Sequence, residues 1–409
     1  MQTNLADFIK NTPDGDEAEA ILRACVHCGF CTATCPTYQL LGDELDGPRG
    51  RIYLIKQVLE GAEVTHSTQT HLDRCLTCRN CESTCPSGVQ YGRLADIGRK
   101  VVEQRVRRPL GQRIQRYVLK EGLSRRSLFT PALRLGQVFR PFLSKPLQDK
   151  LPPLRLAQPW PSRQHARKML VLEGCVQPGM APNINAATAR VLDAVGVQLV
   201  AAPKAGCCGA LRFHMNDQDG GMDDMRRNID AWWPYVEAGI EAIVMTASGC
   251  GVTVKDYGHL LERDPRYAEK AARISALTRD LSEVLPAFEA ELVRRIGMRT
   301  GGERVAYHPP CSLQHGQQIR GKVEGLLRAA GVDVRLCADS HLCCGSAGTY
   351  SMLYPEISKE LRDRKLANLQ ETGAQRIVSA NIGCVSHLQS GTETPVEHWV
   401  ELLDRLLAQ

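Results

Sequence analysis

The sequence predicts an α+β multidomain protein, in which an α-helical, cysteine-rich domain is followed by two repeated α/β domains. Three observations support this prediction. Two closely similar cysteine motifs lie within the first 90 residues. Short apolar runs begin at Met169 and alternate with segments of helical periodicity. In this later region Cys175 and Cys207 recur as Cys311 and Cys343 at an offset of 136 residues, and an internal repeat is a stronger signal than any single residue.

Length and composition are those of a globular protein. The chain has 409 residues, of which 43% are hydrophobic, and this is enough for two or three domains with their own cores. No secretory signal is recognisable near the start, and no run of about 18 apolar residues is present. We therefore expect a cytoplasmic protein whose thiols stay reduced.

Each motif in the first domain reads C-x2-C-x2-C-x3-C-P. This is the bacterial ferredoxin spacing for [4Fe–4S] clusters, in which the fourth cysteine ligates the other cluster. The proline that follows it has no N–H and turns the chain away. The predicted ligands of one cluster are Cys25, Cys28, Cys31 and Cys85. Those of the other are Cys75, Cys78, Cys81 and Cys35.

Structural zinc is the main alternative for these cysteines, because zinc sites often use two C-x2-C pairs. Zinc does not explain a third cysteine at +3 and a Cys-Pro at +7, occurring twice. A disulfide framework is not expected in a long chain without a secretory signal.

The first domain is predicted to span residues 1–106. A helical pattern at 52–59 separates the two motifs, and a second helix over 94–106 closes the domain. Helices between the motifs favour an α-helical ferredoxin-type domain over the compact β-hairpin type. Three arginines lie close to the motifs in sequence, and for each we expect a solvated surface position. An arginine that donates to a cluster sulfur would instead raise its reduction potential. They are Arg49, Arg51 and Arg93.

Residues 107–167 form a predicted linker that is rich in Arg and Pro and holds one or two helices. Between 101 and 168 there are 16 Lys and Arg residues against three acids. A solvated face explains this charge, as does docking on an acidic partner or on anionic lipid. Nucleic acid is not expected, because no helix-turn-helix, zinc-finger or RNA-binding aromatic pattern accompanies the charge.

The two α/β domains are predicted at 168–262 and 304–409, with a helical bridge over 263–303. Alternating strands and helices imply parallel sheets. The cysteines fall just after strands, where α/β folds gather ligands. The predicted strands are 169–172, 197–201, 241–246, 304–307, 332–336 and 376–380. The predicted helices are 185–194, 223–236, 323–330 and 357–369.

Each repeat carries a Cys-Cys-Gly sequence with one cysteine before it and one after it. These thiols are further candidate ligands for a cluster or metal, or a redox-active pair, because thiolates cluster around a soft ligand. Buried reduced thiols are the alternative. The two sets are Cys175, Cys207, Cys208, Cys250 and Cys311, Cys343, Cys344, Cys384. Cys337 fits neither set and is expected in a core. Three nearby histidines are expected to be hydrogen-bonding or surface residues: His27, His308 and His315.

Residues 25–38, 47–51 and 72–88 closely resemble the iron–sulfur subunit family of bacterial glycolate oxidase, or glycolate dehydrogenase, and the likeness extends over essentially the whole chain. The resemblance implies an electron-transfer subunit with two [4Fe–4S] clusters and no catalytic residue of its own. It also implies partner subunits that carry FAD and oxidise glycolate to glyoxylate. Electrons would pass on to the quinone pool, with peripheral contact at the cytoplasmic face of the inner membrane.

The general motifs are shared with other families, so other functions stay open. These are the iron–sulfur subunit of a D-lactate or glycerol-3-phosphate dehydrogenase, and a heterodisulfide-reductase-like enzyme that acts at the Cys-Cys-Gly sites. Heterodisulfide reductase repeats end in C-x-x-C, whereas the matching earlier positions here are Ala247 and Asn381. No G-x-G-x-x-G after a strand and no Walker loop is present, so no flavin or nucleotide site is expected on this chain.

Overall fold

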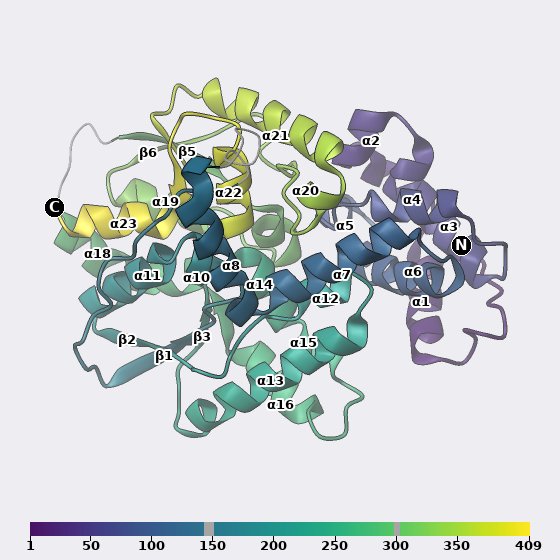
Figure 1. Cartoon of the computed structure of the whole chain (residues 1–409), viewed down its shortest axis with the longest axis horizontal. Coiled ribbons are helices and arrows are strands. Elements are labelled where there is room, and N and C mark those ends of the chain that lie inside the picture. The colour runs from purple at the N-terminus through teal and green to yellow at the C-terminus, as the bar shows by residue number, and fades with distance from the viewer. Residues whose placement is uncertain (143–150, 298–302) are drawn as a thin grey trace. The chain divides into compact units, whose positions relative to one another are not determined.

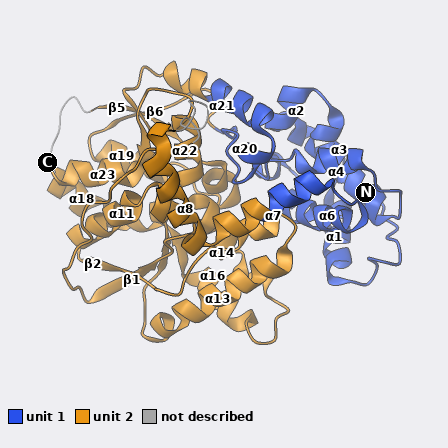
Figure 2. Ribbon diagram, viewed as in Figure 1, with its two compact units in different colours: residues 1–117, 341–365 blue, residues 118–340, 366–409 orange. Residues whose placement is uncertain are grey.

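The computed structural model describes residues 1–142, 151–297 and 303–409. The chain divides into two compact units (Figure 2). Unit 1 comprises residues 1–117 and 341–365, and unit 2 comprises residues 118–340 and 366–409. The mixed architecture confirms the predicted fold class. The five-part division into domains, linker and bridge stays a prediction.

Unit 1 is helical in the described residues and surrounds the two cysteine motifs (Figure 1). Proline occupies the first position of α1, α2 and α3, where its missing N–H costs no hydrogen bond. Apolar faces of α1, α3 and α6 form the core. The elements are α1 (Pro13–Ala24), η1 (Phe30–Thr32), α2 (Pro36–Leu41), η2 (Glu44–Asp46), α3 (Pro48–Leu59), α4 (His66–Asp73), α5 (Asn80–Thr84), α6 (Tyr91–Arg105) and α20 (Tyr350–Leu353).

The segment 341–365 belongs to unit 1 although it comes from the second repeat. The Tyr350 hydroxyl donates to the Arg74 carbonyl oxygen at 3.0 Å. The Tyr354 hydroxyl donates to Asp73 Oδ2 at 3.2 Å. Because these bonds tie the segment to α4 and the loop after it, the second Cys-Cys-Gly sequence lies in the same unit as the N-terminal motifs.

Unit 2 contains two four-stranded sheets in which all strand pairs are parallel, as the alternating pattern predicts. The strand orders are β2-β1-β3-β4 and β6-β5-β7-β8, so strands β5 to β8 occupy the same positions in the second sheet as β1 to β4 in the first. The strands are β1 (Arg167–Val171), β2 (Val197–Ala201), β3 (Ile243–Met245), β4 (Thr278–Asp280), β5 (Arg304–His308), β6 (Asp333–Leu336), β7 (Arg376–Ser379) and β8 (Val396–His398).

The edge strands β4 and β8 are absent from the sequence-based prediction. Both have three residues, and Thr278-Arg-Asp and Val396-Glu-His are too short and too polar to form a recognisable apolar run. Strand β4 lies inside the segment predicted as a helical bridge and pairs with β3. The bridge therefore completes the first sheet as well as connecting the repeats.

Helices of unit 2 cover the sheets and join the two repeats in one core. Helices α11 and α23 come from different repeats and pack together (Figure 1). Arg190 of α11 and Asp404 of α23 form an ion pair of 2.6 Å. The helices are α10 (Gln177–Met180), α11 (Asn183–Ala194), α12 (Ala210–His214), α13 (Gln218–Glu237), α14 (Ser248–Lys255), α15 (Tyr257–Leu260), α16 (Ala268–Leu277), α17 (Leu281–Val284), η4 (Leu285–Phe288), α18 (Glu289–Ile296), η5 (Ser312–Gly316), α19 (Lys322–Ala329), α22 (Ile382–Gln389) and α23 (Trp399–Leu407).

Three helices cross or adjoin the division between the units. Helix α7 (Leu110–Ser124) and helix α21 (Pro355–Gln370) each contribute residues to both units. Helix α8 (Arg126–Phe139) and the turn η3 (Arg140–Phe142) follow in the basic linker segment and belong to unit 2. Among the described helices, none combines the length and hydropathy that a bilayer-spanning helix requires.

Candidate metal centre

The two N-terminal cysteine loops have the same backbone shape. In the first loop, His27 and Gly29 have φ values of 57° and 85°. In the second, Thr77 and Arg79 at the matching positions have φ values of 51° and 59°. Alternation of left-handed and right-handed residues turns successive N–H groups toward one point, and such nests are found at many iron–sulfur sites. The Thr77 N–H donates to Cys75 Sγ at 3.4 Å, as this geometry requires.

The first cavity, which we call site A, is lined by the four thiols predicted for one cluster, Cys25, Cys28, Cys31 and Cys85, and also by Cys81. Burial raises the pKa of Cys31 to about 11, and the neighbouring Cys25, Cys85 and Cys28 thiols contribute to the shift. These thiols are therefore close enough to repel one another when ionised. Site A is open to solvent on one side, where Cys28 and the apolar side chains of Val26 and Phe30 are exposed.

The second cavity, site B, has the reciprocal composition and is lined by Cys35, Cys75, Cys78 and Cys81. Burial raises the pKa of Cys81 well above its usual value, followed by the charges of Cys78 and Cys75. Burial also opposes ionisation of Cys75, but Arg51 and Arg99 outweigh it and hold the pKa of that thiol below its usual value. Site B thus contains a thiol that its surroundings favour as a thiolate.

Arg51 is buried beside site B, with 1% of its surface exposed. Its guanidinium donates to the His71 carbonyl oxygen at 2.7 Å and to Thr37 Oγ1 at 3.1 Å, and it pairs with Asp46 at 3.3 Å. Although burial opposes the charge, Cys75, Tyr91 and Cys35 keep the pKa of Arg51 above its usual value. The expectation of a surface position is therefore wrong for Arg51, because η2 and α4 fold over α3 and provide it with partners.

Arg99 is a second buried cation at site B, and sequence reasoning did not identify it. It donates to the carbonyl oxygens of Leu72 at 2.9 Å and Cys75 at 2.7 Å, and to Thr77 Oγ1 at 2.9 Å. These bonds hold the loop that carries Cys75 against α6. The available signal was an arginine within the apolar stripe of α6, because Ile97, Val101 and Val102 around it are all buried.

The arginines near site A are more exposed and already paired. Arg49 Nε donates to Glu44 Oε1 at 2.6 Å, and both side chains are more than a third exposed. Arg93 lies 3.5 Å from Glu17. For these two residues the expected solvated position agrees with the structure. Site A therefore has little net positive charge around it, in contrast to site B.

Sites A and B share a wall. Pro48, Cys81 and Tyr91 line both cavities, so one layer of side chains separates them. Five reduced thiols line site A and four line site B, with Cys81 common to both, and each cavity has a nest of backbone N–H groups. This donor set suits a [4Fe–4S] cluster in each cavity. Tetrahedral zinc would leave the nests without a function.

The first repeat brings its four candidate thiols together in unit 2. Cys207 hydrogen-bonds with Cys175 and Cys208, and Cys208 also with Cys250. The first of these contacts lowers the pKa of Cys207 well below its usual value and raises that of Cys175. These contacts link the four thiols in a chain, and thiols are ligands that soft metals prefer. Cys207 and Cys208 are buried, and Cys175 and Cys250 are partly exposed.

Backbone contacts hold the first Cys-Cys-Gly loop in place. Asn228 Nδ2 donates to the Cys207 carbonyl oxygen at 2.7 Å, and the Tyr257 hydroxyl donates to that of Cys208 at 2.8 Å. Gly209 has a φ of 90°, and a Cβ there would lie 2.6 Å from the Gly221 carbonyl oxygen. Only glycine therefore lets the two adjacent thiols share one site.

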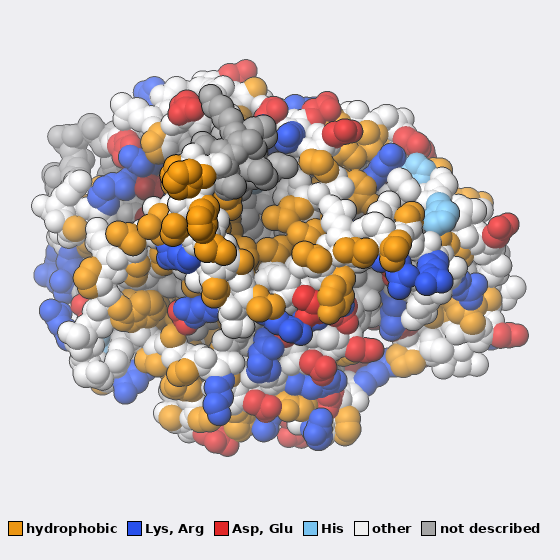
Figure 3. Space-filling model, viewed as in Figure 1, with side chains coloured by type: hydrophobic (Ala, Val, Ile, Leu, Met, Phe, Trp, Pro, Cys, Tyr) orange, Lys and Arg blue, Asp and Glu red, His pale blue; other side chains and the backbone are white. Residues whose placement is uncertain are grey.

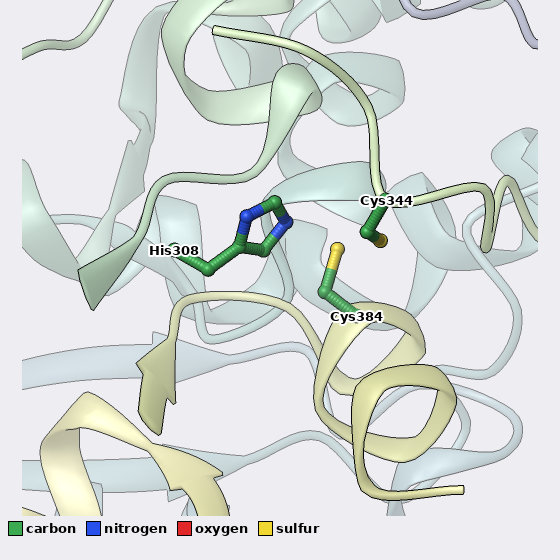
Figure 4. Close-up of side chains that lie close together, drawn as sticks. All are labelled: His308, Cys344 and Cys384. Atoms are coloured by element: carbon green, nitrogen blue, oxygen red, sulfur yellow. The ribbon is translucent and has the colours of Figure 1, made fainter. Parts of the chain in front are cut away.

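The second repeat is arranged differently, since its candidate thiols belong to two units. Cys311 and Cys384 lie in unit 2, whereas Cys343 and Cys344 lie in unit 1. In unit 2, His308 at the end of β5 and Cys384 of α22 point toward one another, with ligand atoms within 4.8 Å (Figure 4). His308 and His315 are both buried, so the surface alternative is wrong for them, and Cys337 is buried as expected.

Two family models match the chain. The 4Fe-4S dicluster domain model matches residues 21–89, which include both N-terminal motifs. The Cysteine-rich domain model matches twice, at residues 169–255 and 305–389, and this confirms the internal repeat. The iron–sulfur character predicted from the spacing is therefore a property of the family.

Full-length relatives extend this result. The glycolate oxidase iron-sulfur subunit of Escherichia coli (strain K12) is 54% identical, over 100% of this chain and 99% of that protein. The probable glycolate oxidase iron-sulfur subunit of Bacillus subtilis (strain 168) is 31% identical, over 92% of this chain and 90% of that protein. Lactate utilization protein A of Geobacillus thermodenitrificans is 26% identical over 54% of this chain. The chain belongs to the family of glycolate oxidase iron-sulfur subunits.

Proposed function

We propose that this chain carries single electrons from a flavin-containing partner subunit, which oxidises glycolate to glyoxylate, toward the quinone pool. The observation that supports the proposal most strongly is the crossed composition of sites A and B, which share a wall and differ in charge. A [4Fe–4S] cluster supplies one-electron transfer when it is bound. The two-electron oxidation of the substrate then belongs to the partner.

Within this proposal the cysteines hold one cluster in each site, four thiols to a site, as the spacing predicts. Site A is the entry point, because its exposed Cys28 and apolar rim allow a partner to approach closely. Arg51 and Arg99 stabilise the extra negative charge of the reduced state at site B. With a cluster held in each site, electrons would pass from site A to site B.

The substrate and the partners come from the relatives. Both full-length relatives carry glycolate oxidase in their names, and the less similar lactate utilization proteins support D-lactate as the second candidate substrate. We further propose a cytoplasmic location with peripheral contact at the inner membrane. The substrate assignment is tested by purifying the complex and assaying it with glycolate, D-lactate and glycerol 3-phosphate. A preference for a substrate other than glycolate would overturn the substrate assignment.

We also propose a third redox or metal site at Cys175, Cys207, Cys208 and Cys250, because the first repeat gathers these reduced thiols and soft metals prefer thiolate ligands. Iron analysis and low-temperature EPR distinguish the possibilities. About eight iron atoms per chain correspond to sites A and B alone, and about twelve would place a cluster in the first repeat. Absence of iron and of a reduced-cluster signal in anaerobically isolated protein would contradict the whole proposal.

A further inference from the structure

Helix α8 and the adjoining turn η3 have apolar side chains on two faces, of which one is packed. A Cβ added at Gly179 of α10 would lie 3.2 Å from the Phe129 ring and 3.3 Å from Leu133. This places Phe129 and Leu133 on the face of α8 that contacts the rest of unit 2. Leu133 is buried accordingly.

The opposite face is apolar and open. Leu128, Leu135, Phe139 and Phe142 are 50%, 61%, 52% and 85% exposed. Their spacing of 7, 4 and 3 residues places them on one stripe, which we call the α8 stripe. Figure 3 shows hydrophobic side chains gathered over this helix. Monomeric soluble proteins rarely leave such a row of large apolar side chains in water without a function.

The charge around the α8 stripe has one sign. Residues 125–142 contain four arginines and neither Asp nor Glu. Arg125 and Arg126 pair with Glu121 and Glu173 from neighbouring segments, whereas Arg134 donates to the neutral Gln137 amide. The wider segment 101–168 retains 16 basic residues against three acidic ones. A second helix of the same segment, α7, exposes Leu110 and Ile114 one turn apart.

We propose that the α8 stripe is the surface through which this protein binds an anionic lipid bilayer, with the helix lying in the interfacial plane. The exposed apolar row lies on a segment that carries arginines and no Asp or Glu, and the neighbouring Glu121 and Glu173 are held in ion pairs. This combination matches the apolar interior and the anionic headgroups of such a bilayer. A protein partner would more commonly present mixed charges and a shaped pocket. The inference rests on the proposed function, because a quinone acceptor is dissolved in the bilayer.

Vesicle co-sedimentation of the full-length, cluster-loaded chain tests this proposal. We expect binding to phosphatidylcholine vesicles with about 30% phosphatidylglycerol, weakening with salt, and at least about tenfold weaker binding to pure phosphatidylcholine. The double variant Leu135→Glu/Phe142→Glu should lose binding by at least about tenfold. Arg134→Gln should lower affinity about fivefold on anionic vesicles.

The matched control is Leu336→Glu, an exposed apolar residue at the end of β6, which should bind as the unchanged protein does. Iron content and far-UV circular dichroism verify that each variant is folded and loaded. Equal binding by the double variant overturns the proposal. A second result would also overturn it: the unchanged chain does not bind vesicles, and the double variant no longer co-purifies with the flavin subunits. The α8 stripe would then be a protein interface. The readout involves no turnover, so its failure leaves the electron-transfer proposal intact.

Discussion

Sites A and B have the same cysteine spacing and the same backbone shape, yet their surroundings are opposite. Site A has an exposed thiol, Cys28, beside exposed Val26 and Phe30, and the arginine that lines it is paired with Glu44. The thiols of site B are buried or only partly exposed, and two buried guanidinium groups, from Arg51 and Arg99, lie beside them. A repeated motif can therefore provide two identical ligand shells, while the helices around it assign a different electrostatic role to each.

This difference orders the reduction potentials. Two unit charges about 6 Å apart interact by roughly 3 kcal/mol at an effective dielectric constant of about 20. Asp46 neutralises part of the charge of Arg51, and Asp96 and Asp73 offset part of that of Arg99, which donates to backbone oxygens at site B. A net advantage of about 1–2 kcal/mol corresponds to roughly 50–100 mV for one electron. Site B should therefore have the higher potential.

The largest expected effect is the loss of a whole cluster. Cys28→Ala at site A or Cys78→Ala at site B should lower the iron content from about eight to about four atoms per chain. Either variant should abolish glycolate-dependent dye reduction by the complex, while flavin stays on the partner. Cys337→Ala, which removes a buried thiol outside both sites, is the control and should retain iron. Full activity in either site variant would contradict the proposed electron route.

The second expected effect isolates the charge difference. Arg51→Met removes one of three partners of the fully buried Asp46, which keeps Arg74 at 2.9 Å and His71 at 3.1 Å, and should lower the free energy of unfolding by about 2–3 kcal/mol. It should also lower the potential of site B by roughly 50–100 mV. Arg51→Lys, which keeps the charge, should recover most of the potential. An EPR-monitored redox titration measures both sites in one sample.

Arg49→Met is the matched control for the charge comparison. Arg49 is more than a third exposed and paired with Glu44, so its removal should shift the potential of site A by much less. If Arg49→Met and Arg51→Met shift the potentials of their sites equally, burial of the arginines is not the cause of the difference in potential between sites A and B.

A smaller effect distinguishes the two loops by backbone strain. Gly29 has a φ of 85°, and a Cβ there would lie 2.9 Å from an Arg49 nitrogen. Gly29→Ala should destabilise the site A loop by about 1–2 kcal/mol. Arg79→Ala, at the matching position of the second loop, should cost less than about 1 kcal/mol because a non-glycine residue already adopts the conformation. Denaturant unfolding of the reconstituted variants measures both values. A larger loss for Arg79→Ala would contradict this account.

The smallest expected difference is kinetic. Exposed Cys28 lets a chelator or oxygen reach site A, whereas the thiols of site B are buried or only partly exposed. We expect the site A signal to disappear a few times faster during exposure to an iron chelator. Timed samples examined by EPR report the two signals separately, and simultaneous loss would show that access does not differ.

Most regular elements could be predicted from the sequence where local patterns are strong. The predicted strand over 197–201 coincides with β2, and the helix over 323–330 differs from α19 by one residue at each end. Strands β4 and β8 could not be predicted, because each is a three-residue edge that forms only beside a completed neighbour. The burial of Arg51 could not be predicted for a related reason. The groups that pair with its guanidinium come from other elements, and the local sequence does not show that they surround it.

The local sequence determined the features that depend on short-range geometry. The cysteine spacing within each loop brings three thiols of a site together regardless of the remaining chain. In the first loop Gly29 occupies a position where the backbone is left-handed. The cysteine offset of 136 residues indicated the internal repeat, and the alternation of strands and helices indicated the two parallel sheets.

Only the tertiary structure decided how the two equivalent loops differ. Arg51 comes from α3, Arg99 from α6 and Asp46 from η2, and their convergence around site B depends on how those helices pack. The physical reason is that an electrostatic environment is a sum over groups that are close in space but distant in sequence. No pattern within one segment can therefore reveal it.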